Sequence, residues 1–199
     1  MSTAGPAHFE PPLILTIDVG TSSVRTLLYD RLGHLVEGFV AQERYTMRSA
    51  SDGTTEDDPD VALERVARCV DALLLQAGAL AQQIGAVAVD TLVSNILALD
   101  EGGLPLTPLV IYADTRNDAD SLALRSELDE EAVHERTGCL LRTSYWPARL
   151  AWFQRTQPQV WPRVARWITL GEYLELKLFG RCRVSYSAGY AGTSGLIHT

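Results

Sequence analysis

The segment Asp18-Val19-Gly20-Thr21-Ser22-Ser23-Val24-Arg25 combines residue types that suit a bound phosphate. It follows a short apolar run, and a turn at a strand end exposes several backbone N–H groups toward one point. Gly20 lets the backbone approach a ligand closely, and Arg25 offers a charge-assisted hydrogen bond. Further hydroxyl donors come from Thr21, Ser22 and Ser23.

Asp18, which ends the apolar run, is placed to hold Mg²⁺ through bound water. Mg²⁺ gives up its water reluctantly and takes few protein ligands, so one carboxylate beside a phosphate suits it. The segment is neither a Walker A loop nor a Gly-x-Gly-x-x-Gly fingerprint. A Ser/Thr-rich hairpin that carries an acid by chance is the alternative that the pattern leaves open.

A second candidate is Tyr112-Ala113-Asp114-Thr115-Arg116, at the end of an expected extended segment. Residues at alternating positions of a strand project to one side, so Tyr112, Asp114 and Arg116 can meet one ligand. A carboxylate accepts hydrogen bonds from sugar hydroxyls, a guanidinium donates them, and an aromatic face packs against C–H groups. The alternative is a surface ion pair at the start of the next helix, with Asp114 as its N-cap.

Polar residues also follow the next buried run, where Asp90, Ser94 and Asn95 stand. Loops at the carboxyl ends of strands commonly line ligand clefts in α/β proteins. These three side chains can therefore bind a polyol, or they are ordinary turn residues.

The composition excludes several classes of protein. The 199 residues are 46% hydrophobic and 21% charged, as in an ordinary globular protein. Seventeen Lys and Arg against twenty-five Asp and Glu give a net charge of −8, which argues against nucleic-acid binding but not against a small anionic ligand. No apolar run approaches the roughly 20 residues of a membrane span, and residues 1–12 lack the features of a secretory signal. We therefore expect a cytoplasmic protein with neither nucleic acid nor membrane as a partner.

The cysteines and histidines add no metal or redox motif. Cys69, Cys139 and Cys182 are far apart and form no Cys-x-x-Cys pair, so we expect them in the core. The histidines show no metal-ligand spacing.

Periodicity and turn residues predict the order of elements. Strands at 13–17, 24–29 and 34–42 are joined by short connections and form an antiparallel meander. A polar loop over 46–58 leads to a helix that begins at Asp58-Pro59 and stops at Gly78. The remaining elements are a buried strand at 84–89, strands at 96–99, 109–113 and 167–170, and helices at 116–128, 130–136, 147–156 and 171–179.

This order favours one fold class. A doubly wound domain would alternate strand and helix from its first element, whereas this chain begins with three strands. The order suits a ribonuclease-H-like, or actin-like ATPase, α/β domain whose mixed sheet opens with a three-strand antiparallel meander. The aromatic-rich last third is expected to be mostly core.

Five segments occur in an order that points to a family. They are the 18–25 segment with its flanking strands, Thr55-Glu56-Asp57-Asp58-Pro59, the 112–116 segment, Thr137-Gly138, and the stretch 184–188 leading to 192–196. Together they resemble the N-terminal domain of the FGGY carbohydrate kinases, most closely the gluconokinase- and xylulokinase-like branches. The resemblance runs from about residue 13 to the end. We expect residues 1–12 to be a flexible leader and residues 13–199 to be an FGGY-type N-terminal domain, incomplete at its C-terminal end.

The resemblance implies ATP-dependent phosphorylation of a sugar, sugar acid or polyol hydroxyl, with ATP and Mg²⁺ held between two actin-like domains. By this likeness Asp18 is the Mg²⁺-associated acid, and the terminal phosphates are cradled by Gly20, Thr21, Ser22, Ser23 and Arg25. Asp114 and Arg116 match the substrate-side segment of the family, with Tyr112 where a Trp is usual. Many relatives carry a Met-His pair where this chain has Val93-Ser94, so Ser94 and Asn95 take over the substrate-facing role.

The resemblance also implies what lies elsewhere. The catalytic Asp of the family follows everything present here, so the catalytic base is expected beyond residue 199. The expected partners are a carbohydrate or polyol, a C-terminal domain in the same chain or a separate one, and a second copy of this chain. The alternatives are a non-catalytic sugar- or nucleotide-binding module, half of a split kinase, and another actin-like ATPase.

Overall fold

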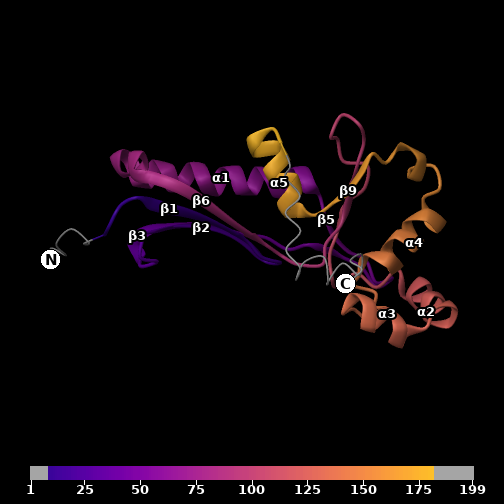
Figure 1. Cartoon of the computed structure of the whole chain (residues 1–199). Helices are drawn as coiled ribbons and strands as arrows, with labels where there is room; N and C mark the ends of the chain where they lie inside the picture. The colour runs from indigo at the N-terminus through magenta and orange to yellow at the C-terminus, as the bar shows by residue number, and fades with distance from the viewer. Residues whose placement is uncertain (1–8, 182–199) are drawn as a thin grey trace. The chain divides into compact units, whose positions relative to one another are not determined.

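The computed structural model describes residues 9–181, which fall into two compact units (Figure 1). The first unit comprises Met1–Thr46 and Asp60–Thr91, and the second comprises Met47–Pro59 and Leu92–Thr199. Cys182 and the motif segments 184–188 and 192–196 lie outside the described residues.

The first unit is built on a four-stranded mixed sheet of order β3-β2-β1-β6. Its strands are β1 (Leu13–Val19), β2 (Ser23–Tyr29), β3 (Leu35–Arg44) and β6 (Ile84–Thr91). β2 pairs antiparallel with both β1 and β3, which confirms the predicted meander, and β6 pairs parallel with β1. The turn between β2 and β3 closes through Gly33, whose N–H donates to the Asp30 carbonyl at 3.0 Å and whose φ is +83°.

Helix α1 (Pro59–Ala77) supplies the other layer of this unit, along the sheet in Figure 1. Its buried residues Ala62, Val66, Cys69 and Leu73 recur every three or four positions and so form one apolar stripe. The Thr26 hydroxyl of β2 donates to the Cys69 carbonyl at 2.9 Å, which ties the stripe to the sheet. The helix ends at Ala77, directly before Gly78, as predicted, and a 3₁₀ segment, η1 (Gly78–Gln83), leads on to β6.

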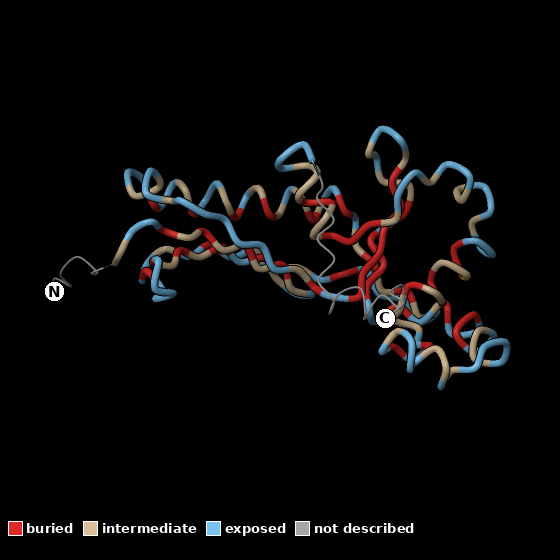
Figure 2. Tube along the Cα trace, in the orientation of Figure 1, coloured by how far each residue is buried: buried red, intermediate tan, exposed pale blue. Residues whose placement is uncertain are grey.

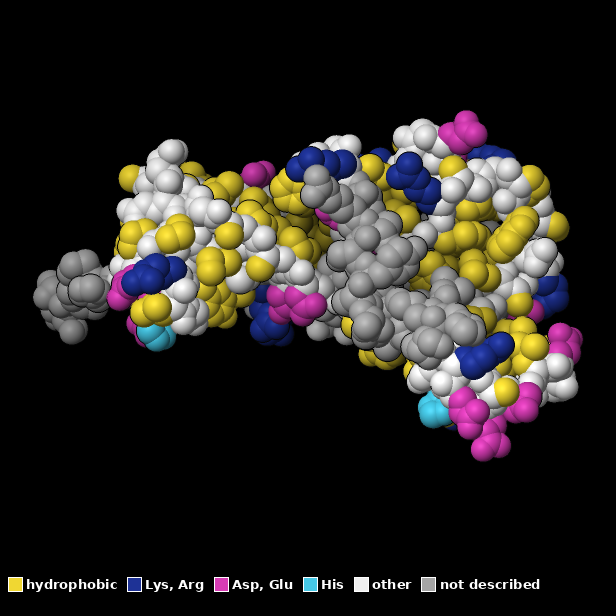
Figure 3. All heavy atoms as spheres, in the orientation of Figure 1, with side chains coloured by type: hydrophobic (Ala, Val, Ile, Leu, Met, Phe, Trp, Pro, Cys, Tyr) yellow, Lys and Arg dark blue, Asp and Glu magenta, His cyan; other side chains and the backbone are white. Residues whose placement is uncertain are grey.

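Strand β6 corrects the expectation of a buried strand. Val87 and Val89 pair with the buried Leu15 and Ile17 of β1, yet they are 48% and 43% exposed. β6 is the edge of the sheet and, within the described part of this unit, no element covers it. Figure 2 shows the strand in pale blue, and Figure 3 shows hydrophobic side chains at the surface of this unit.

The second unit contains two small sheets. One has the order β4-β5-β8, from β4 (Arg48–Ser49), β5 (Thr55–Asp57) and β8 (Leu109–Val110), and the other pairs β7 (Leu97–Leu99) with β9 (Arg166–Ile168). The 46–58 segment was expected to be a loop, but it forms β4 and β5 because these pair with each other and with β8. The strand expected over 109–113 ends at Val110, since the Asp114 N–H donates to the Ile111 carbonyl and closes a turn.

The helices of the second unit lie close to their predicted positions. They are α2 (Asp118–Glu127), α3 (Glu130–Thr137), α4 (Trp146–Thr156) and α5 (Leu170–Phe179), with a 3₁₀ turn, η2 (Trp161–Arg163), before β9. α3 ends at Gly138 with φ +72°, as a left-handed C-cap requires. Within residues 9–181, no helix is both long and apolar enough to cross a bilayer.

Aromatic side chains make the core of the second unit. Ile96, Val110, Trp146, Trp152 and Phe153 are buried together. Leu150, Trp161 and Trp167 pack against this cluster. The Trp152 and Phe153 ring centroids lie 4.6 Å apart. The expectation that the aromatic-rich last third is mostly core is thus confirmed for these residues.

Candidate functional site

In the first unit, the 18–25 turn lies at the end of the β1–β2 hairpin. Asp18 of β1 faces Arg25 of β2 in the strand register. Arg25 Nη2 and Nε lie 2.5 and 3.1 Å from Asp18 Oδ2. The side chain of Asp18 is 34% exposed and that of Arg25 is 51% exposed. The pair is therefore an accessible, weak ion pair and not a buried salt bridge.

The tip of the turn presents small polar residues to solvent. Thr21 and Ser22 are exposed, and the Gly20 N–H donates to the Ser23 carbonyl at 3.0 Å. A Cβ added to Gly20 would meet nothing closer than the Ser23 carbonyl oxygen, at 3.6 Å, and Gly20 is not among the residues with positive φ. The fold of this turn therefore does not itself require a glycine at this position.

Tyr45, directly after β3, holds the turn from the side. Its hydroxyl donates to the Gly20 carbonyl, and its N–H donates to the Ser22 carbonyl at 3.0 Å. The guanidinium of Arg65 on α1 lies 4.2 Å from the centre of the Tyr45 ring. Sequence reasoning missed Tyr45, because no local pattern links it to a glycine 25 residues earlier.

A polar hollow of about 490 Å³ adjoins the turn. It is lined by Ser22, Ser23, Gln42, Arg44, Tyr45 and Thr46. Arg44 is the charged member of this lining, so the hollow favours an anion over a cation. Its two serines come from the turn predicted to bind phosphate.

The carboxylates of this unit are arranged compatibly with Mg²⁺. Asp90 of β6 pairs in register with Asp18, so the two side chains lie on the same face of the sheet. Across residues 9–181, no cluster of three or more His, Cys, Asp or Glu could enclose a metal by itself. One or two carboxylates with retained water and substrate phosphates are what Mg²⁺ commonly uses, and Asp18 with Asp90 fits that pattern.

In the second unit, the 112–116 segment is a turn held by its own carboxylate. Asp114 is 1% exposed, and its Oδ2 accepts the Thr55 N–H at 2.8 Å. Its Oδ1 accepts the Arg116 N–H at 3.1 Å. Asp114 is thus neither the cap of α2, which begins at Asp118, nor part of a surface ion pair. Tyr112 in the same segment is 49% exposed.

Arg116 is held between two acids and a ring. Its Nη2 lies 2.8 Å from Asp114 Oδ2 and 2.7 Å from Glu56 Oε2, and its guanidinium carbon lies 4.6 Å from the Trp152 ring centre. Burial opposes the charge of Arg116, but the hydrogen bonds and charges of Asp114 and Glu56 outweigh it. The pKa of Arg116 is therefore raised above its ordinary value.

Gly53 and Glu56 belong to this arrangement, although sequence reasoning gave neither a role in the site. Gly53 has a φ of +93°, and a Cβ there would lie 2.4 Å from the Thr115 hydroxyl oxygen. Its carbonyl accepts the Thr115 N–H at 3.0 Å. The one available signal was the Thr55-to-Pro59 stretch, which contributed to the family resemblance without a chemical role.

Ser94 and Asn95 are both buried, and the Asn95 side chain and the Ser94 carbonyl are hydrogen-bonded within this unit. Asn95 Oδ1 accepts the Leu170 N–H at 2.7 Å, and its Nδ2 donates to the Leu92 carbonyl. Ser94 has a φ of +51°, uncommon for a residue with a side chain, and its carbonyl accepts from Arg149 at 2.6 Å. These two residues fix the course of the chain directly before β7, within the second unit.

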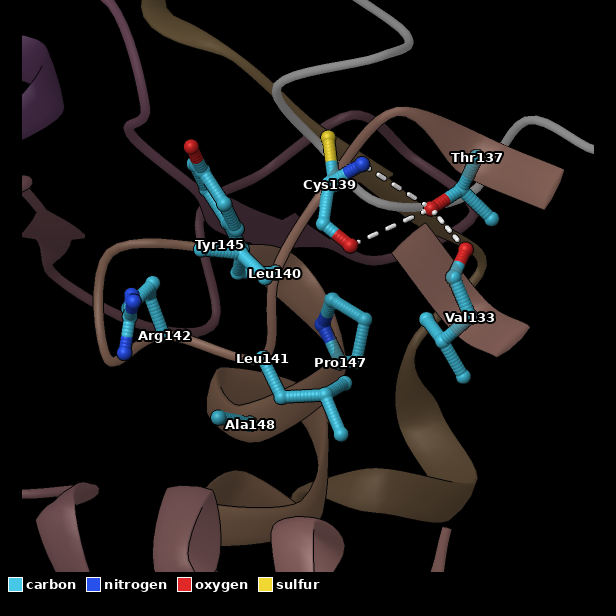
Figure 4. A pocket seen from close by; sticks show the side chains of 9 residues that line it. All are labelled: Val133, Thr137, Cys139, Leu140, Leu141, Arg142, Tyr145, Pro147 and Ala148. Atoms are coloured by element: carbon cyan, nitrogen blue, oxygen red, sulfur yellow. Dashed lines mark hydrogen bonds between the residues drawn. The ribbon is translucent and has the colours of Figure 1, made fainter. Parts of the chain in front are cut away.

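A small pocket near the Thr137-Gly138 turn is too small for a substrate. Figure 4 shows it between the end of α3 and the start of α4, with Cys139, Leu141 and Tyr145 among its lining residues. The Thr137 hydroxyl accepts the Cys139 N–H at 3.1 Å and donates to the Val133 carbonyl. The pocket volume is about 10 Å³, which holds at most one water.

The fold shows the structural class to which this domain belongs. The mixed sheet with its opening meander is that of an actin-like ATPase domain, and solved FGGY carbohydrate kinases share it. A xylulose kinase from Rhodospirillum rubrum superposes with a TM-score of 0.86 at 26% identity, over 94% of this chain and 37% of its own. A Plasmodium falciparum glycerol kinase solved with ADP has a TM-score of 0.81 at 17% identity, over 96% and 38%.

The chain belongs to the FGGY family of carbohydrate kinases, whose N-terminal domain it matches over residues 13–198. The gluconokinase of Bacillus subtilis (strain 168) is 24% identical over 185 residues, which are 93% of this chain and 35% of the relative. The chain thus spans about a third of the length of the relatives it matches.

Proposed function

We propose that this chain contributes the phosphate-binding and substrate-binding parts of an ATP-dependent carbohydrate kinase. The observation that carries the proposal is the accessible Asp18–Arg25 pair beside a turn of small polar residues, within a chain of this family. Phosphoryl transfer depends mainly on positioning and charge neutralisation, which such a turn with Mg²⁺ supplies.

On the nucleotide side, Gly20, Thr21, Ser22, Ser23 and Arg25 hold the terminal phosphates of ATP. Asp18 holds Mg²⁺ through water, and the ion would neutralise charge on the phosphates. Gly20 supports this assignment. The turn has space for a Cβ at this position, so the fold alone does not explain a glycine, whereas a phosphate that approaches closely does. Arg44, in the hollow that adjoins the turn, adds positive charge near the phosphates.

On the substrate side, we assign a sugar, sugar acid or polyol to Tyr112, Asp114, Arg116, Ser94 and Asn95. Tyr112 is exposed and contacts the substrate through its ring. Arg116 donates hydrogen bonds, and the buried Asp114 orients it. Ser94 and Asn95 contribute by shaping the adjoining backbone, through the Ser94 carbonyl and the Asn95 amide.

The whole enzyme is proposed to be longer than this chain. Residues 13–199 form its N-terminal actin-like domain, after a leader at 1–12. The catalytic base and the rest of the nucleotide site come from a C-terminal domain in the same chain or a separate one. A second copy of the chain is a further proposed partner, and we place the enzyme in the cytoplasm.

Titration calorimetry of the 199-residue chain tests the proposal. The titrants are Mg·ATP, Mg²⁺-free ATP, and a panel of gluconate, xylulose, glycerol and ribulose. We expect weak Mg-dependent ATP binding, binding of one sugar class, and poor turnover in a phosphoryl-transfer assay, because one wall of the site is supplied elsewhere.

Two variants separate the assignments. Arg25→Gln is expected to weaken ATP binding and leave sugar binding unchanged, and Tyr112→Ala is expected to do the reverse. Binding of neither ligand to the parent chain would contradict the proposal. If the chain binds and rapidly hydrolyses ATP but binds no sugar, another actin-like ATPase is favoured. If it phosphorylates a sugar rapidly, the chain is sufficient for catalysis by itself.

A further inference from the structure

We infer that Tyr45 is a positioning residue that orients the backbone of the 18–25 turn toward phosphate. The inference rests on the proposed function of that turn. Its basis is a pair of hydrogen bonds from Tyr45 to the turn. The Tyr45 hydroxyl donates to the Gly20 carbonyl, and the Tyr45 N–H donates to the Ser22 carbonyl.

Peptide geometry determines what this contact does. Each peptide group of the 18–25 turn is planar and trans, so its C=O and its N–H point in opposite directions. With the Gly20 carbonyl turned to the Tyr45 hydroxyl, the N–H of Thr21 points away from Tyr45. The same holds for the Ser22 carbonyl and the N–H of Ser23.

The consequence for a ligand is electrostatic. Carbonyl oxygens carry partial negative charge and repel a phosphate, whereas converging N–H groups attract one. Tyr45 draws two carbonyls to its own side and so keeps two N–H groups on the other. A turn without this restraint would have to order these peptides when the anion binds, and the affinity would fall accordingly.

Arg65 holds the tyrosine in turn. Its guanidinium lies 4.2 Å from the Tyr45 ring centre, so a residue of α1 limits the movement of a ring that follows β3. The chain of contacts therefore runs from α1 through the ring to the turn, entirely within the first unit. Tyr45 acts through the turn and is not assigned a catalytic role.

Tyr45→Phe tests the inference, because it removes the hydroxyl bond to Gly20 and keeps the ring, the Arg65 contact and the backbone bond. Tyr29→Phe is the matched control, since Tyr29 lies at the far end of β2 and its hydroxyl has no hydrogen bond within residues 9–181. The full 199-residue chain is titrated with Mg·ATP and with inorganic tripolyphosphate. Amide NMR resonances of Thr21 and Ser23 report the binding.

We expect the amides of Thr21 and Ser23 to shift saturably in the parent chain and in Tyr29→Phe. In Tyr45→Phe the Kd for both ligands should rise about five- to tenfold, the effect of losing one hydrogen bond. If Tyr45 had only a structural role, Tyr45→Phe would lower the melting temperature and leave the Kd unchanged. That result would overturn the inference.

The two proposals fail differently. Absence of saturable shifts in the parent chain would overturn phosphate binding by this turn. Binding by the parent chain with an equal Kd in Tyr45→Phe would overturn only the role of Tyr45. If Tyr45→Phe does not fold, Arg65→Met replaces it, with an expected two- to threefold rise in Kd, and an unchanged Kd again overturns the inference.

Discussion

Arg116 Nη2 lies 2.7 Å from Glu56 Oε2, although the two residues are 60 positions apart in the chain. The opposite carboxylate oxygen of Glu56 accepts from Arg48 Nη1, also at 2.7 Å. Glu56 is buried, whereas Arg48 is largely exposed. One acid thus serves two arginines in different surroundings, and its removal should affect them unequally.

Glu56→Gln keeps the size of the side chain and removes its charge. We expect the free energy of unfolding to fall by about 2 kcal/mol, because a part-buried guanidinium loses a charged hydrogen-bond partner. Urea denaturation measures the change. Arg48→Gln, which removes only the exposed partner, should cost less than about 1 kcal/mol. Equal losses in the two variants would show that burial does not distinguish these pairs.

Gly53→Ala should destabilise the second unit by about 1–3 kcal/mol, since the alanine would occupy a positive φ and meet the Thr115 hydroxyl. Gly138→Ala is the control for conformation alone, because Gly138 also has a positive φ but its Cβ would meet nothing within 4 Å. Thermal unfolding of both variants gives the comparison. If Gly53→Ala lowers the stability no more than Gly138→Ala does, the Thr115 side chain moves away from the added methyl group at no cost.

Gly20→Ala should separate binding from stability. The turn has space for a methyl group at this position, so the melting temperature should stay within about 2 °C of the parent. The Kd for Mg·ATP should rise about tenfold, or roughly 1.4 kcal/mol, because the methyl group would stand where a phosphate approaches. An unchanged Kd would remove the ligand-based reason for a glycine here.

Glu43 of β3 should make the first unit sensitive to acid. The Arg68 side chain donates two hydrogen bonds to it, at 2.8 and 2.9 Å, and these hold the pKa of Glu43 below its ordinary value. A lowered pKa in the folded state means that the unfolded chain binds the proton more readily. The stabilisation is therefore complete above the unfolded pKa, about 4.3, and is lost as the pH falls through the lower folded value.

Urea denaturation at pH 7 and at several values below 4.5 measures this loss. Glu43→Gln should flatten the acid limb of the profile, and Glu37→Gln, at an exposed position of the same strand, is the control for removing a carboxylate. Parallel profiles for Glu43→Gln and the parent would show that the pair contributes no pH dependence.

The edge strand β6 should cause concentration-dependent self-association of this chain, since an exposed apolar edge can pair with another strand. Val87→Lys places a charge on this edge and should shift sedimentation profiles toward monomer. Leu75→Lys, on the exposed side of α1, is the control for added charge alone. Equal association of the parent and Val87→Lys would exclude β6 as the contact.

The amino-acid sequence by itself determined the elements whose signals are local. The β1–β2–β3 meander with its short connections, α1 and α3 follow from apolar periodicity and turn residues within a few positions of one another. The turn from Asp18 to Arg25 was likewise found from residue types in one short segment. Such features depend on neighbours in the chain, so a single sequence contains them.

Only the tertiary structure decided the contacts between distant segments. Tyr45 reaches Gly20 across 25 residues, Asp114 reaches Thr55 across 59, and the strand pairing of β5 with β8 turns an expected loop into part of a sheet. The exposure of β6 and the burial of Asn95 likewise depend on which elements pack nearby. Periodicity shows that a residue prefers burial or exposure, but the partner that satisfies it is set by the packing of the whole unit.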